Sequence, residues 1–148
     1  AFTKNSNADI IIFGSYSYTD ARYSSDHKDA ATKGKKVENA PRNIFRGGIT
    51  AGYKTFLLTT QLSYVGEAFS DANNSFAPYA NSNNGLIPSY TVTDITATYK
   101  FSKGLNLKAG INNLTDARYF TRRAGGYPGP GALPAEGRTF FISIGAKL

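Results

Sequence analysis

Segments of about ten residues in which apolar and polar side chains alternate recur along this chain and constrain its fold more than any other feature. Successive side chains of a β-strand point to opposite faces of a sheet, so a period of two predicts strands with one apolar and one polar face. We expect six such strands, over residues 9–19, 43–53, 56–65, 91–101, 105–114 and 138–148. The sequence therefore predicts an all-β fold built from antiparallel strands.

The predicted strands are long enough to cross a membrane. A tilted strand needs about 9–11 residues to span a bilayer, whereas strands of soluble proteins commonly have about 5–6. The connections at 54–55 and 102–104 are short enough for hairpin turns, while those at 20–42, 66–90 and 115–137 are long. Short turns on one side and long loops on the other are typical of outer-membrane β-barrels. A soluble antiparallel sandwich with one solvated face shows the same alternation and remains the alternative.

The two faces of the predicted sheet differ in chemistry. We expect aromatic residues near the strand ends to lie at the two membrane interfaces: Tyr18, Tyr23, Tyr53, Phe56, Tyr64, Phe69, Tyr90, Tyr99 and Phe101. The opposite face is expected to be strictly polar and to line a wet lumen, with Arg46, Asp94, Lys100 and Lys108. We expect these four charges to pair with one another rather than to bind another domain.

Composition excludes several kinds of site. The chain of 148 residues has no Cys and one His, which excludes a disulfide scaffold, a Cys-ligated metal site and a multi-histidine metal site. It contains no P-loop, nucleotide-binding glycine motif, nucleophile elbow or zinc-protease motif, so we expect no enzyme activity and no cofactor. The net charge of +7 suits acidic partners. Nucleic acid is disfavoured because the aromatic residues share a face with Leu and Ile rather than with basic residues.

Six strands do not close a transmembrane pore, because the smallest single-chain barrels have about 8 and an open edge in lipid leaves backbone groups unsatisfied. The chain begins at Ala1 and contains no Met, so we interpret it as a processed product or a piece of a longer protein. Either several chains assemble into one barrel, or residues 1–148 form the C-terminal part of a larger one. We favour the second arrangement, because the last segment ends the chain on an outward-facing apolar residue.

Four motifs carry a resemblance to a known family. Residues 112–119 (NNLTDARY) are followed by an Arg-containing loop, a Gly/Pro stretch at 127–131 and GRTF at 137–140. Upstream, 18–23 (YTDARY), 40–43 (APRN) and 88–94 (PSYTVTD) occur in the matching order. Together they resemble TonB-dependent outer-membrane receptors, in the ferric-siderophore or ferric dicitrate-type branch.

The resemblance implies a fold and a function. These receptors have a 22-stranded barrel around an N-terminal plug, so the chain would supply its last six strands, with the long loops outside the cell. It implies uptake of a ferric chelate across the outer membrane of a Gram-negative bacterium, energised by TonB acting on the plug, which is absent here. Other implied partners are outer-membrane lipids, lipopolysaccharide and the barrel-assembly machinery. Family members usually end in an aromatic residue, whereas this chain ends in Leu148. A passive or oligomeric barrel and a soluble all-β binding module remain alternatives.

Candidate ligand contacts lie in the long loops. Basic residues outnumber acidic ones in 20–42, and Arg offers rigid donors suited to the oxygens of an anionic chelate. The candidates are Arg22, Arg118, Tyr119, Arg122, Arg123 and Tyr127. Solvated loop charges or contacts to lipopolysaccharide phosphates are the alternative for each Arg. We expect the pair Asp116 and Arg118 to fix the strand exit, the Asn-rich stretch at 73–84 to be a flexible loop, and His27 to be exposed.

Overall fold

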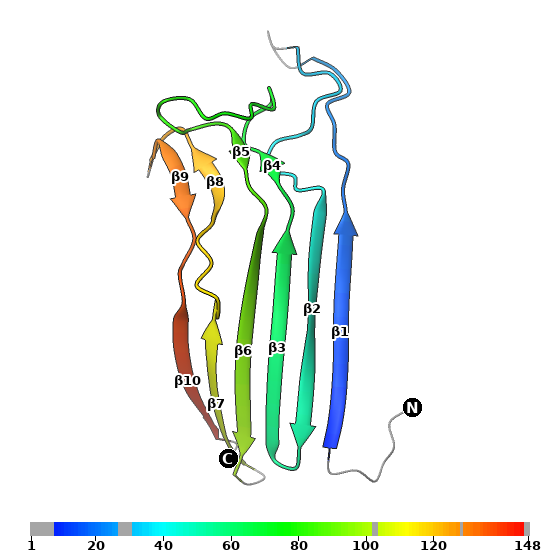
Figure 1. Cartoon of the computed structure of the whole chain (residues 1–148), viewed down its shortest axis with the longest axis vertical. Coiled ribbons are helices and arrows are strands. Elements are labelled where there is room, and N and C mark those ends of the chain that lie inside the picture. The colour runs from blue at the N-terminus through cyan, green and yellow to red at the C-terminus, as the bar shows by residue number, and fades with distance from the viewer. Residues whose placement is uncertain (1–7, 27–30, 102–103, 128, 147–148) are drawn as a thin grey trace.

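The computed structural model describes residues 8–26, 31–101, 104–127 and 129–146. Its main sheet has six antiparallel strands in the order β1-β2-β3-β6-β7-β10 (Figure 1). These strands are β1 (Ala8–Tyr18), β2 (Asn43–Tyr53), β3 (Phe56–Val65), β6 (Tyr90–Lys100), β7 (Leu105–Asn112) and β10 (Thr139–Ala146). The all-β prediction is confirmed. No helix among the described residues is long and apolar enough to cross a membrane.

The predicted strands agree with the observed ones to within a residue or two. β7 ends at Asn112 rather than at residue 114, because Asn113 adopts a left-handed backbone conformation with φ of 50°. The turn at 54–55 is a hairpin in which Tyr53 pairs with Phe56 and Lys54 has φ of 53°. The predicted turn at 102–104 and the terminal Leu148 fall on residues outside the described ranges, apart from Gly104.

All three long connections lie at one end of the sheet, opposite the turn between β2 and β3 (Figure 1). Two of them contain short strands that the alternation did not predict. β4 (Ala68–Phe69) pairs with β5 (Leu86–Ile87), and β8 (Phe120–Ala124) pairs with β9 (Gly131–Pro134). Among the described residues, the buried hydrophobic side chains are Ala68, Phe69 and Ile87. The core therefore lies beneath the loops, not on the sheet.

The register confirms the predicted apolar face. Ile12 pairs with Ile49 across β1 and β2, and Ile111 pairs with both Ile95 and Phe140. Side chains on this face are uncovered, and Ile12 is 75% exposed. An exposed apolar face of this extent across a whole sheet is typical of a surface that contacts lipid or another protein.

The opposite face is not strictly polar, so that part of the prediction was wrong. Phe13 and Phe141 lie on it, at register positions beside Gly48 and Gly110. A Cβ built on Gly110 would lie 2.5 Å from Phe141 Cε1 and 2.8 Å from the backbone oxygen of Ile95. Each aromatic ring thus occupies the space that a glycine leaves free on the neighbouring strand.

Gly110→Ala is expected to destabilise the sheet by about 1–3 kcal/mol, because the added methyl group overpacks against Phe141 and the β6 backbone. Gly14→Ala is the matched control, since a Cβ there would meet its nearest atoms at 3.7 Å and 3.9 Å, ordinary contact distances. Urea unfolding of each variant of the refolded protein in detergent measures the difference. Equal stabilities of the two variants would contradict the packing role of Phe141.

Candidate functional site

A cavity of about 240 Å³ lies on the polar face of the sheet at its loop end. Arg46 of β2, Val65 of β3 and Tyr90 of β6 line it, together with Thr121 from β8. Val65 pairs directly with Tyr90, which places these side chains at one level of the sheet. We call this cavity the mouth site, because it lies where the polar face meets the long loops.

Aromatic stacking holds one wall of the mouth site. The ring of Tyr90 stacks on that of Tyr119, with centroids 4.3 Å apart and an angle of 22° between the planes. Tyr119 lies just before β8, so this contact joins the third loop to the sheet. Arg46 is exposed, and its planar guanidinium offers donors for carboxylate or phenolate oxygens. A cation beside aromatic faces suits an anionic or aromatic ligand.

The motif at 112–119 builds a corner between β7 and β10. Asn113 is 3% exposed, accepts a hydrogen bond from Ala117 N at 2.8 Å and donates to Ala117 O at 3.0 Å. Asp116, with φ of 52°, accepts from the backbone N–H of Arg138 at 3.0 Å. It also pairs with Arg118 at 2.9 Å. Asp116 therefore links the exit of β7 to the entry of β10.

The same contacts set the charge state of Asp116. The backbone hydrogen bond from Arg138, followed by the charge of Arg118, lowers the pKa of Asp116 below its ordinary value of 3.8. A carboxyl group whose pKa is lowered in the folded state stabilises that state above its unfolded pKa and stops doing so as pH falls. The corner is thus intact at neutral pH and weakens only in acid.

Asp116→Ala is expected to loosen this corner, because it removes the acceptor for Arg138 N and places Ala at a positive φ that favours Asn, Asp or Gly. Asp116→Asn keeps an acceptor and tolerates the same backbone conformation. It is therefore expected to retain most of the protection of the corner's backbone amides from hydrogen exchange. Amide hydrogen exchange at residues 113–118 and 138–140 compares the variants near neutral pH. Equal protection in the wild type and Asp116→Ala would contradict the assigned role.

The six residues predicted as ligand contacts do not lie together in one site. Tyr119 adjoins the mouth site, as described, whereas Arg118 is held by Asp116. Arg123 donates to Ser82 O at 3.0 Å and Leu86 O at 3.2 Å, so it joins the third loop to the second. Arg122 and Tyr127 lie at exposed positions of the third loop, and Tyr127 is fully exposed.

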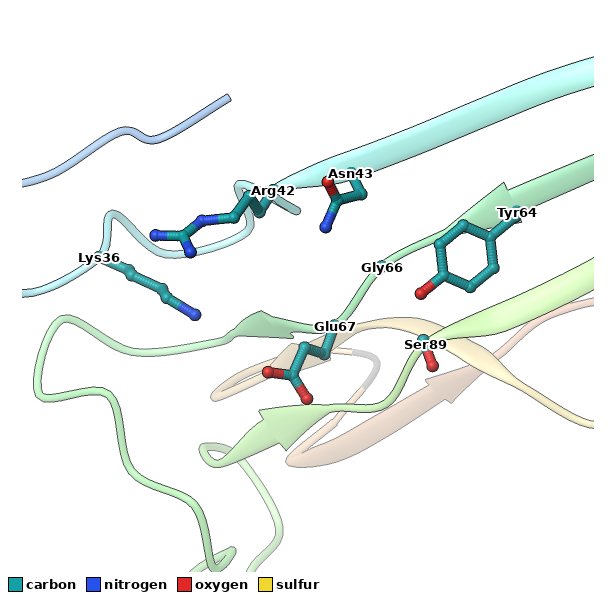
Figure 2. A pocket seen from close by; sticks show the side chains of 7 residues that line it. All are labelled: Lys36, Arg42, Asn43, Tyr64, Gly66, Glu67 and Ser89. Carbon is teal, nitrogen blue, oxygen red and sulfur yellow. The ribbon is translucent and has the colours of Figure 1, made fainter. Parts of the chain in front are cut away.

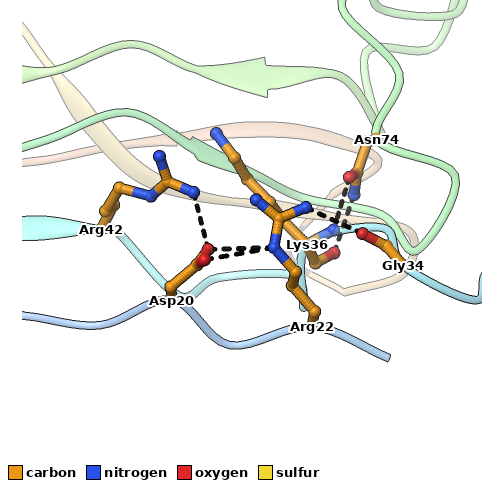
Figure 3. Close-up of polar contacts among 6 residues, drawn as sticks. All are labelled: Asp20, Arg22, Gly34, Lys36, Arg42 and Asn74. Carbon is orange, nitrogen blue, oxygen red and sulfur yellow. Dashed lines mark hydrogen bonds and ion pairs between the residues drawn. The ribbon is translucent and has the colours of Figure 1, made fainter. Parts of the chain in front are cut away.

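Arg22 lies in the first loop, within a separate polar cluster (Figure 3). It pairs with Asp20 at 3.2 Å and donates to Gly34 O at 2.9 Å, while Arg42 pairs with Asp20 at 2.6 Å. Hydrogen bonds from Arg42, and then Arg22, lower the pKa of Asp20 below its ordinary value of 3.8. These contacts of Arg22 thus lie within its own loop, and Asp20 joins it to Arg42 just before β2.

The Asn-rich stretch, predicted to be a flexible external loop, makes specific hydrogen bonds. The side chain of Asn74 accepts from Lys36 N and donates to Lys36 O, both at 2.8 Å (Figure 3). Asn84 is 7% exposed and accepts from Tyr79 N at 2.9 Å. The Asn74 bonds tie the second loop to the first, whereas the Asn84 bond lies within the second loop. His27 lies outside the described residues.

Three aromatic residues do not lie at the lipid-facing interface as predicted. Tyr90 faces the polar side, where it stacks on Tyr119. Phe69 is 5% exposed and packs edge-on against Phe76, with centroids 5.2 Å apart. Tyr23 donates to Glu38 within the first loop. Their sequence position near strand ends suggested the interface, but the loop contacts determine their place.

The four charges predicted to pair across the polar face do not do so. Within the described ranges the ion pairs are those of Asp20 and Asp116. Asp94 instead accepts from Asn113 N at 2.8 Å, and the Lys108 ammonium lies 5.7 Å from the centre of the Phe141 ring. Arg46 is left available to the mouth site. The described residues contain no group of three or more His, Asp or Glu side chains that could hold a metal ion.

Comparison with known proteins decides the family. Residues 5–114 match the family model described as TonB dependent receptor-like, beta-barrel. The chain belongs to this family. The ferrioxamine B receptor of Salmonella typhimurium is 32% identical over 119 residues, which cover 74% of this chain and 15% of that receptor. The ferrichrome outer membrane transporter/phage receptor of Escherichia coli is 30% identical over 124 residues, covering 76% and 15%.

A solved transporter structure shares the fold. The ferric citrate transporter FecA in its unliganded form superposes with a TM-score of 0.80 and 24% identity, over 92% of this chain and 20% of that chain. Together with the family match, this likeness shows that the six-stranded sheet is a β-barrel segment of the TonB-dependent receptor type. The relatives are receptors and transporters, and this chain spans 15–20% of the three described here.

Proposed function

We propose that this chain is the C-terminal barrel part of an outer-membrane receptor that takes up a ferric chelate, energised through TonB. The observation that carries the proposal is the match of residues 5–114 to the receptor barrel family. The geometry supports it, since the sheet has an apolar outer face, a more polar inner face and three long loops at one end. In this account the loops face outward and the turns face the periplasm of a Gram-negative bacterium.

The edges of the sheet support a larger barrel. In the described sheet, β1 pairs only with β2 and β10 only with β7, so each carries a row of backbone groups that must pair elsewhere. Further strands of the same receptor would supply these partners and complete a 22-stranded barrel around a plug. The barrel-assembly machinery would insert it.

The chemistry of the mouth site supports an anionic ligand. Arg46 is exposed and free of ion pairs with described carboxylates, and the stacked rings of Tyr90 and Tyr119 form an adjacent wall. Ferric chelates of carboxylate or catecholate type carry negative charge, so the guanidinium of Arg46 would favour their capture. A ligand of the ferric dicitrate type is one member of this class. The chain would bind and orient the chelate without covalent chemistry.

The proposal is tested by deleting the gene that encodes this chain and measuring iron uptake from ferric citrate, a ferric catecholate and a ferric hydroxamate. We expect uptake from one chelate to fall in the deletion strain and to fall equally when TonB is removed. Unchanged uptake of all three would contradict the ferric-chelate function. Uptake that needs the gene but not TonB would indicate a passive barrel.

A further inference from the structure

Two loops that lie far apart in the sequence supply opposite parts of the wall of the mouth site. Ile87 of β5 lines it from the second loop, and Thr121 of β8 lines it from the third. Ile87 is 4% exposed and pairs with Ala68 of β4, which also lines the cavity. The second-loop wall is therefore packed in place, so the width of the site depends on where the third loop holds Thr121.

A β-bulge falls on the residue that the third loop contributes. The pairing of β8 with β9 shifts between Phe120 and Arg122, which leaves Thr121 as the extra residue of its strand. A bulge bends its strand and re-aims a side chain, and bulges are over-represented next to functional sites. Thr121 thus belongs to the wall because of the local shape of the β8–β9 hairpin, and a movement of the hairpin moves the wall.

The side chain of Arg123 connects the two walls. Its Nη1 donates to Ser82 O at 3.0 Å, and its Nη2 donates to Leu86 O at 3.2 Å. Leu86 directly precedes Ile87 in β5, and Arg123 lies two residues after Thr121 in β8. One guanidinium therefore joins the strands that carry both wall residues.

The surroundings of Arg123 suit a bond between loops better than a contact with ligand. The side chain is half-buried, and its buried Nε has no acceptor among the described residues. The guanidinium carbon lies 4.8 Å from the centre of the Phe120 ring, which holds it against its own hairpin. Arg123 is not among the described residues that line the mouth site. It therefore acts on that site through the walls that it joins.

We propose that Arg123 is a positioning residue that fixes the width of the mouth site by holding the β8–β9 hairpin on β5. The inference rests on the proposed function, since it concerns chelate binding at that same site. Tyr119 attaches the base of the hairpin to Tyr90 of the sheet. Without the Arg123 bonds, the hairpin would pivot about this base and carry Thr121 away from Ile87. A chelate would then meet the assembled site in only a fraction of the molecules, and its apparent affinity would fall by that fraction.

A second cavity at the loop end does not depend on this hairpin. It measures about 310 Å³ and lies between the first and second loops (Figure 2). Its described lining includes Lys36, Arg42 and Glu67 and contains no residue of the third loop. The effect of Arg123 is therefore specific to the mouth site.

Distances between two spin labels test this role without any ligand. Labels are attached to Tyr79→Cys in the second loop and Tyr127→Cys in the third, because both positions are exposed and the chain has no Cys of its own. Pulsed electron paramagnetic resonance is recorded on the intact receptor in detergent. Arg123→Gln is expected to broaden the distances and shift them to longer values, and Arg123→Lys, which keeps a charged donor, to do so less. Arg122→Gln is the matched control, since it removes the same charge from the adjacent exposed position, and it is expected to change nothing.

Chelate affinity is then measured on the unlabelled variants with ferric citrate, a ferric catecholate and a ferric hydroxamate. The chelate that the wild type binds is expected to bind Arg123→Gln roughly 3–10-fold more weakly. The factor should match the loss of the short-distance population in the same variant, which a general destabilisation of the protein would not produce. Arg46→Glu removes a contact instead, so it is expected to lose affinity with unchanged distances.

Three outcomes would overturn the inference. They are unchanged distances in Arg123→Gln, equal broadening in Arg122→Gln, and longer distances in Arg123→Gln with an unchanged affinity. If the wild type bound none of the three chelates, the proposed function would fail, and the distances alone would still decide whether Arg123 holds the two walls together.

Discussion

Leu62→Lys is expected to block assembly of the receptor in the outer membrane, whereas Gln61→Lys is expected to be tolerated. Leu62 lies near the middle of β3 on the apolar face, where it pairs with Gly47 and Thr93. A lysine on the lipid face of a transmembrane barrel costs about 2–4 kcal/mol at the bilayer midplane. Ile144→Lys, on the same face of β10, should act in the same direction.

Gln61 provides the matched control because it adjoins Leu62 and faces the other side of the same strand. It pairs with Asp94 of β6, so a lysine there gains an opposite charge instead of a lipid surface. The measurement is the amount of heat-modifiable folded receptor in outer-membrane fractions. Normal assembly of Leu62→Lys, or equal loss in both variants, would contradict the assigned faces.

Arg46→Glu is expected to weaken chelate binding by roughly 10–100-fold, because it replaces a charged donor of the mouth site with a group that repels an anion. The register places Arg46 beside Ser15 and Ser63 on the polar face, so the change alters few packing contacts. Binding is measured by quenching of intrinsic fluorescence on titration with the chelate identified in the uptake assay.

Lys108→Glu is the control for this effect, since it reverses a charge on the same face but on β7, near the turn end of the sheet. Its affinity is expected to match that of the wild type. If both variants lost affinity equally, the general field of the inner face would explain binding better than the mouth site. If neither lost affinity, Arg46 would not contact the ligand.

Strand positions were predictable from sequence because the environment of each face repeats every second residue. Ile10 and Ile12 of β1, for example, meet Ala51 and Ile49 of β2 on the predicted face. The short strands in the loops were not predictable in this way. β4 and β5 have two residues each, too few to show an alternation of apolar and polar side chains. Hydrogen bonds between loops, such as that from Arg123 to the Ser82 oxygen, likewise have no local sequence pattern.

The mouth site was predictable only in part. Arg46 was placed on the polar face correctly, because it alternates with Phe45 in β2. Tyr90 was assigned to the lipid interface, although its parity matches that of Asp94 in β6 and so already indicates the polar face. The stacking of Tyr90 on Tyr119 joins residues 29 positions apart, and no local pattern of the sequence specifies such a contact.

The central claim is that this chain forms part of the wall of a large outer-membrane receptor. An antibody against residues 118–127 of the third loop, used on immunoblots of separated membrane and soluble fractions, tests it most directly. We expect a band in the outer membrane several times larger than the 15.9 kDa of this chain. A band near 15.9 kDa, or one in the soluble fraction, would contradict it.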